Sequence, residues 1–67
     1  MSTHLERLHE ELAELTGRLE KLAEFFDTPT FRELGHEYRS TLSTQFLAMS
    51  QYAACLRLRL ALEVGHE

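Results

Sequence analysis

The sequence has one cysteine, one proline, three glycines and no tryptophan. A lone cysteine cannot form a disulfide within the chain, and no glycine-rich loop is present that could cradle a phosphate. No apolar run approaches the roughly 20 residues that cross a membrane, and the charged first residues do not resemble a signal peptide. We therefore expect a cytoplasmic protein without membrane contact, in which Cys55 stays reduced.

The chain is short, with 67 residues, and its net charge is −4. Chains below about 70–80 residues bury little surface and usually need disulfides, a metal, tight helix packing or self-association. The negative charge argues against nucleic acid as the main partner. We expect a single domain over residues 1–67, stabilised by helix packing and by association of copies.

Leucines that alternate three and four residues apart predict a long amphipathic helix over about residues 3–26. Thr3 and Glu6 have the spacing of a capping box at its start. The apolar positions form an unbroken coiled-coil-type seam: Leu5, Leu8, Leu12, Leu15, Leu19, Leu22 and Phe26. This helix can therefore bury one apolar stripe against a single partner.

Pro29 interrupts the helical pattern within a connector at residues 27–35. Thr28 is suited to cap a short helical turn with Pro29 at its first position, and Gly35 is expected to end that turn in a left-handed conformation. A second long helix is expected over about residues 36–63, with Gly65 just beyond its end. Two long helices and a short connector predict an all-α fold, an antiparallel two-helix hairpin.

The second expected helix is apolar on two sides. Its main stripe would face the first helix: Leu42, Phe46, Met49, Ala53, Leu56 and Leu60. A second group falls nearly opposite: Leu47, Ala54, Leu58 and Ala61. One partner helix cannot cover both, so the second group predicts an interface between copies and a homo-oligomeric helical bundle. The alternative is that Leu47 and Leu58 are isolated surface leucines.

Four polar or aromatic residues recur every seven positions on the second helix, and therefore follow one flank of its main stripe: Tyr38, Gln45, Tyr52 and Arg59. Tyrosine rings stack on bases, an amide can read a base edge, and a guanidinium grips phosphate. Between Tyr38 and Leu62 the chain has no acid. This row predicts a nucleotide-binding site.

Arg39 and Arg57 are further candidates for holding phosphate beside that row. The competing interpretation is that the tyrosines and the glutamine merely border the core. For Arg57 and Arg59, near the end of the second helix, the competing interpretation is that they form surface salt bridges with Glu6 and Glu10.

The histidines and the cysteine give little indication of a metal site or of catalysis. Four histidines are candidate metal ligands: His4, His9, His36 and His66. His4 and His9 are five positions apart and so lie on different sides of a helix, and neither has a second His or Cys three or four positions further on. We therefore expect no metal site. Cys55 is expected to be a buried, inert thiol. No pair of acidic residues is placed for general acid–base catalysis, so we expect no enzyme activity and no cofactor.

The spacing of the apolar and polar positions resembles that of the crAss-phage-related small helical proteins of tailed phages, over nearly the whole chain. The matching positions are Glu11, Leu15, Leu19, Leu22, Phe25, Phe31, Leu34, Leu42, Gln45, Met49, Tyr52, Leu56, Arg59 and Leu60. In size and architecture the chain is also similar to phage sponge proteins, the anti-CBASS and anti-Thoeris hairpins, which sequester nucleotide signals of bacterial immunity. No residue role is carried over from them.

Together these features predict a phage-encoded immune-evasion protein that binds and sequesters a small nucleotide signal in the host cytoplasm without cleaving it. Tyr38 and Tyr52 would stack on bases, Gln45 would hydrogen-bond, and the three arginines of the second helix would hold phosphates. One alternative is an acidic helical inhibitor or adaptor that engages a host defence protein. Another is a purely structural oligomerisation module.

Overall fold

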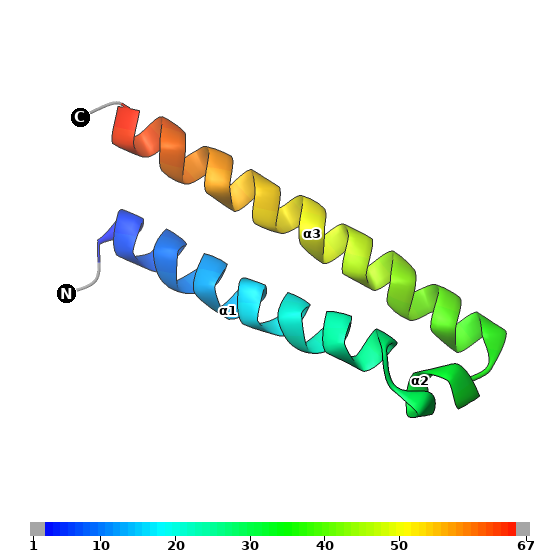
Figure 1. Cartoon of the computed structure of the whole chain (residues 1–67). Helices are drawn as coiled ribbons and strands as arrows, with labels where there is room; N and C mark the ends of the chain where they lie inside the picture. Colours follow the sequence, from blue (N-terminus) through cyan, green and yellow to red (C-terminus); the bar gives the residue numbers. More distant parts are fainter. Residues whose placement is uncertain (1–2, 66–67) are drawn as a thin grey trace.

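The computed structural model describes residues 3–65, which form three α-helices and no strand. Helix α1 spans His4–Phe26, α2 spans Pro29–Glu33 and α3 spans His36–Gly65. Helices α1 and α3 lie side by side and antiparallel, and α2 joins them at one end (Figure 1). The all-α prediction is confirmed for this part of the chain.

The start of α1 is held by the capping box that the sequence predicts. The Glu6 N–H donates to Thr3 Oγ1 at 3.1 Å, and the Thr3 N–H donates to Glu6 Oε2 at 3.3 Å. Two backbone donors that the helix itself cannot satisfy thus find partners.

The connector is organised by Thr28 and Pro29. The Thr28 hydroxyl accepts from the Phe31 N–H at 3.2 Å and donates to the Phe25 carbonyl at 2.6 Å, so it links the end of α1 to the start of α2. Pro29 takes the first position of α2, where no N–H is needed.

Two expectations about glycines are wrong. No glycine among residues 3–65 has a positive φ, so Gly35 does not adopt the left-handed conformation. Leu34 ends α2 instead, in extended backbone with φ −69° and ψ 149°. At the other end α3 continues through Gly65 rather than stopping before it.

Aromatic rings close the end of the α1–α3 pair where α2 lies. The Phe31 ring packs 5.8 Å from Phe25 and 4.9 Å from Phe26, measured between ring centroids. The Phe26 ring also lies 5.5 Å from that of Phe46 on α3. The short α2 therefore covers the end of the apolar seam and anchors the connector.

The core is a single layer between α1 and α3. Its buried side chains are Leu8, Leu15, Ala53, Leu56 and Leu60, with Leu5, Leu12, Leu19 and Met49 packed around them. The leucine seam and the main stripe therefore meet as the sequence predicts. Such a thin core stabilises a chain of this size only marginally.

The two long helices differ in how their apolar residues are distributed. Helix α1 is strongly one-sided, whereas α3 carries apolar residues nearly all round. Even so, none of the helices formed by residues 3–65 combines the length and the apolarity needed to span a bilayer.

Candidate functional site

The seven-residue row on α3 lies exposed along one side of the molecule, next to α1. All four members are exposed in the structure: Tyr38, Gln45, Tyr52 and Arg59. We refer to this side as the α1–α3 flank. Because α3 is one continuous helix from His36 to Gly65, a seven-residue step returns to nearly the same side of it.

Tyr52 is attached to α1 through Glu11. The Tyr52 hydroxyl donates a hydrogen bond to Glu11 Oε1. This bond to a carboxylate raises the pKa of Tyr52 above its usual value of 10.0, and the negative charge of Glu11 adds to the effect, while the positive charge of Arg59 opposes it. The ring of Tyr52 is therefore fixed at one position on the flank, although 44% of the residue stays exposed.

The Tyr52–Glu11 contact is one of several that relate residues of α1 to residues of α3. Contacts at the two ends of the pair show which further residues lie side by side. His4 lies beside Glu63, and the Phe26 ring packs on that of Phe46. Tyr38 therefore lies beyond the level of Phe26, the last residue of α1. The α1 row, which we define as His4, Glu11, Arg18 and Phe25, was not identified from the sequence. The seven-residue spacing of this α1 row can be seen in the sequence, but its position beside the row on α3 cannot.

Arg59 and Arg57 are not engaged in the salt bridges considered above. Within residues 3–65, no carboxylate oxygen lies within 4.0 Å of a side-chain nitrogen of either arginine. The salt-bridge interpretation of these two residues is therefore wrong for the described chain. The Arg59 guanidinium is close enough to Tyr52 to act on its pKa, so the two share the flank.

The six candidate ligand residues do not form one cluster. Arg57 precedes Arg59 by two positions, a turn of about 200° on an α-helix, and so points to another side of α3. Arg39 shares the side of Arg57 but lies eighteen residues away, about 27 Å along the helix. Arg39 is half-buried, and its Nε has no hydrogen-bond partner within residues 3–65. Four of the six candidates therefore share the flank, and these two arginines do not.

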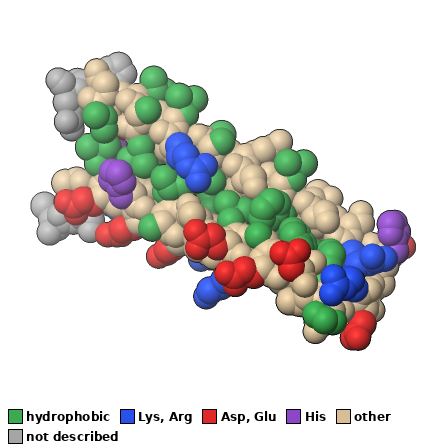
Figure 2. Space-filling model, viewed as in Figure 1, with side chains coloured by type: hydrophobic (Ala, Val, Ile, Leu, Met, Phe, Trp, Pro, Cys, Tyr) green, Lys and Arg blue, Asp and Glu red, His purple; other side chains and the backbone are tan. Residues whose placement is uncertain are grey.

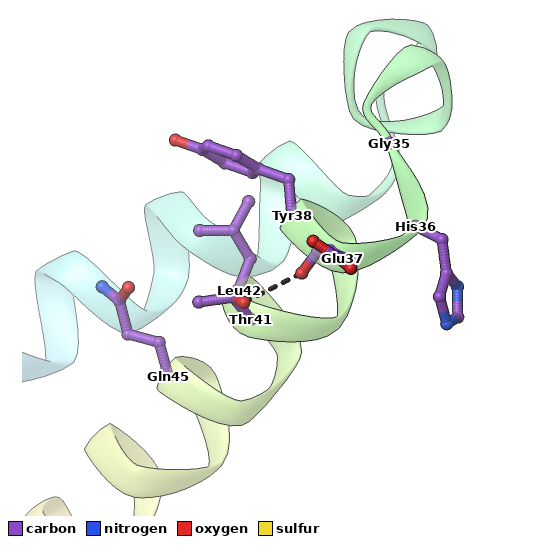
Figure 3. Close-up of a pocket in the computed structure, with 7 residues that line it drawn as sticks. All are labelled: Gly35, His36, Glu37, Tyr38, Thr41, Leu42 and Gln45. Carbon is purple, nitrogen blue, oxygen red and sulfur yellow. Dashed lines mark hydrogen bonds between the residues drawn. The ribbon is translucent and has the colours of Figure 1, made fainter.

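A wide hollow of about 770 Å³ lies at the start of α3, open to solvent. Its lining comprises Gly35, His36, Glu37, Tyr38, Thr41, Leu42 and Gln45. Figure 3 shows Tyr38, Leu42 and Gln45 pointing to the side of α3 along which α1 runs, whereas His36 points away. Two members of the row thus border a space of the size that small-molecule ligands occupy.

Gln45 is held only weakly inside the hollow. Its Nε2 donates to Met49 Sδ at 3.9 Å, a poor acceptor one helical turn further on. Thr41 is less available, because its hydroxyl donates to the Glu37 carbonyl at 2.8 Å (Figure 3). Of these two polar groups, a ligand could therefore recruit the Gln45 amide at the lower cost.

Charges are divided between the two long helices. Figure 2 shows hydrophobic side chains along the seam between them, with acidic side chains gathered over α1. Residues 1–27 hold seven acids and three bases, whereas residues 28–67 hold four of each. An anionic group would therefore be attracted to the α3 side of the flank.

The outward side of α3 is apolar and uncovered in the single chain. All four predicted interface residues are exposed there: Leu47, Ala54, Leu58 and Ala61. Leu47 and Leu58 are 58% and 61% exposed. Cys55 is exposed as well, so the expectation of a buried thiol is wrong. Cys55 is near the border of this outward side rather than facing α1.

The histidines take different positions. His4 Nε2 lies 3.3 Å from Glu63 Oε1, which ties the open ends of α1 and α3 together. His66, one of the histidines considered as a metal ligand, lies outside the described residues. Within residues 3–65, no three side chains of the metal-binding types gather at one place.

The chain matches a known protein family over most of its length. A family model described as Sequestin matches residues 2–62, nearly the whole chain. No curated protein and no solved structure matches the chain.

Proposed function

Because the chain belongs to the Sequestin family, we propose that it sequesters a small nucleotide signalling molecule of a bacterial host without cleaving it. The family description supports sequestration, and the α1–α3 flank supports a nucleotide as the ligand. The resemblance to crAss-phage-related proteins and phage sponges further supports a phage origin, with the host cytoplasm as the place of action and immune evasion as the purpose.

The observation that carries this proposal is the pairing of a half-exposed ring held by Glu11 with a guanidinium that has no ion-pair partner within residues 3–65. Tyr52 is held by Glu11, and Arg59 lies one seven-residue step further along α3. A base stacked on the ring would place its sugar phosphate toward the guanidinium, which can grip it with a planar fork. Because Tyr52 already has a hydrogen-bond partner on α1, the ordering cost of binding falls mainly on the exposed Arg59 side chain.

Binding without catalysis fits the protonation properties of the flank. A general acid or base works best when its pKa lies near the operating pH. The pKa of Tyr52 moves upward, away from neutrality, because its hydroxyl is bonded to the Glu11 carboxylate. Tyr52 is therefore suited to contact a ligand and poorly suited to move a proton.

We propose that the α1–α3 pair is the hairpin protomer of a homo-oligomer that forms through the outward side of α3. Leu47, Ala54, Leu58 and Ala61 supply an apolar surface without charge, and the two alanines allow close approach of another helix. Association would also supply the buried area that a single-layer core lacks. Such assembly could bring the otherwise separate Arg39 and Arg57 of different copies toward shared ligands.

Isothermal titration calorimetry tests the function. The purified protein is titrated with cyclic dinucleotides, cyclic trinucleotides and ADP-ribose derivatives, and each bound compound is then recovered and checked for cleavage. We expect one member to bind and to be recovered intact, and Arg59→Ala to weaken its binding at least about tenfold. Arg32→Ala on α2 removes an equal charge away from the flank and is the control. Absence of binding across the panel would end the proposal.

The acidic surface of α1 supports a second candidate, an inhibitor or adaptor that engages a basic protein surface. Four exposed acids lie on α1 away from α3: Glu10, Glu14, Glu20 and Glu24. Only a long contact of 4.0 Å between Glu14 and Arg18 involves any of them as an ion pair within the described chain. Replacing the acids by glutamine should abolish this activity and leave nucleotide binding unchanged, whereas Arg59→Ala should do the opposite.

A further inference from the structure

We infer that Glu11 determines the specificity of the proposed site by accepting hydrogen bonds from two adjacent donors on the uncharged part of the ligand. Either the Watson–Crick edge of a guanine or the vicinal hydroxyls of a ribose offers such a pair. The inference rests on the proposed function, because it names the chemistry that the centre of the flank would recognise.

Glu11 has acceptor capacity beyond its bond to Tyr52. A carboxylate offers about four lone-pair positions on its two oxygens. The Tyr52 hydroxyl takes one position on Oε1, and Glu11 is exposed. The carboxylate therefore lies beside a half-exposed ring and keeps its second oxygen available to a ligand.

The negative charge of Glu11 determines which part of a nucleotide can lie at Tyr52. A phosphate placed there would face a carboxylate at close range, and like charges repel. The cationic members of the flank lie one seven-residue step away: Arg59 along α3 and Arg18 along α1. These steps span about 10 Å each. The phosphates would therefore sit toward the arginines, and the base or the sugar at the centre.

A carboxylate accepts and cannot donate, so it selects groups that carry N–H or O–H. Adenine and cytosine each offer a single amine on this edge, whereas guanine offers N1–H and an adjacent amine that two carboxylate oxygens can accept together. A ribose with both hydroxyls free offers the same paired geometry. A ligand that has neither pair leaves the carboxylate desolvated without compensation.

Glu11→Gln isolates this role. The glutamine carbonyl still accepts from the Tyr52 hydroxyl, so the ring keeps its place, but the second oxygen is replaced by an amide NH2 group, which donates. Glu20→Gln is the matched control, because it changes the net charge equally. Glu20 lies nine residues further along α1, about half a turn around the helix, and points away from Tyr52.

Calorimetry of the full chain with two ligand pairs distinguishes the sources of the donors. Cyclic di-GMP and cyclic di-IMP differ only in the guanine amine, whereas adenosine diphosphate and dideoxyadenosine diphosphate differ only in the ribose hydroxyls. We expect the wild type and Glu20→Gln to prefer the donor-bearing member of one pair by at least about tenfold, and Glu11→Gln to lose that preference.

Two results would overturn the inference while leaving the function intact. In one, the wild type binds both members of each pair equally tightly. In the other, Glu11→Gln keeps the wild-type preference. If the wild type binds none of the four compounds and none of the broader panel, the proposed function itself fails, and the role of Glu11 with it.

Discussion

Helices α1 and α3 share one core, yet they are built in different ways. Helix α1 has one apolar stripe, and its remaining surface is charged and mainly acidic. Helix α3 has an apolar side toward α1, another toward solvent, and between them a row of aromatic and polar residues without an acid from Tyr38 to Leu62. The comparison indicates that α1 buries its one apolar stripe and adds the Glu11 carboxylate to the flank, whereas α3 also exposes a second apolar side that no other part of residues 3–65 covers.

The largest expected effect is a loss of stability that distinguishes the two apolar sides of α3. Leu56 is fully buried against α1, and truncating such a leucine to alanine costs about 2–5 kcal/mol. In so small a domain this loss should largely abolish folding at every protein concentration. Leu58, on the outward side, is 61% exposed in the single chain. Leu58→Ala should therefore reduce stability only at concentrations where copies associate.

The stability of both variants is measured by chemical denaturation followed by circular dichroism. The measurement is repeated over a hundredfold range of protein concentration. The distinction between the two sides of α3 would be contradicted if Leu58→Ala lost as much free energy of unfolding as Leu56→Ala, and lost it at every protein concentration.

A second prediction compares the outward surfaces of the two helices. Leu47→Glu with Leu58→Glu places two charges in the proposed interface and should convert the assembly into single chains, because buried unpaired charges are strongly unfavourable. Ala13→Glu adds a charge to the exposed side of α1 and should leave assembly unchanged. Sedimentation velocity reports the masses. If the wild type already sediments as a single folded chain at micromolar concentration, the proposed assembly is refuted.

The smallest expected effect concerns the bond that joins the helices on the flank. Folding raises the pKa of Tyr52 above 10.0, because its hydroxyl donates to the Glu11 carboxylate. The folded state therefore holds this proton more tightly than the unfolded state. The resulting stabilisation is complete below pH 10 and is lost as the pH rises through the pKa of the folded protein.

A Tyr38→Phe background leaves Tyr52 as the only tyrosine, so its phenolate absorbance can be titrated alone. Adding Glu11→Ala should lower the midpoint of that titration, whereas Glu20→Ala should not move it. Equal midpoints for the two variants would show that Glu11 does not act on Tyr52.

Local sequence patterns predicted the elements whose stability depends on near neighbours. The Thr3 capping box, the Thr28 cap and the start of α2 at Pro29 each involve residues within a turn of one another. The prediction for Gly35 failed because extended backbone at Leu34 already redirects the chain, so no left-handed residue is required.

The candidate site was predicted only on its α3 side. The seven-residue spacing of Tyr52 and Arg59 is a property of one helix, and it was visible in the sequence. The contribution of Glu11 was not, because its bond to Tyr52 joins residues 41 positions apart. The exposure of Cys55 was missed for a related reason: its apolar neighbours in sequence lie around α3, not all on the side that α1 covers.

By itself the sequence determined the helices, the caps at the starts of α1 and α2, and the side that each helix buries. These follow from the backbone geometry of a 3.6-residue turn and from the transfer of apolar groups out of water. Only the tertiary structure decided which residues of α1 stand level with which residues of α3. That register depends on how two whole surfaces interlock, so it alone brought a carboxylate to the centre of an otherwise aromatic and basic row.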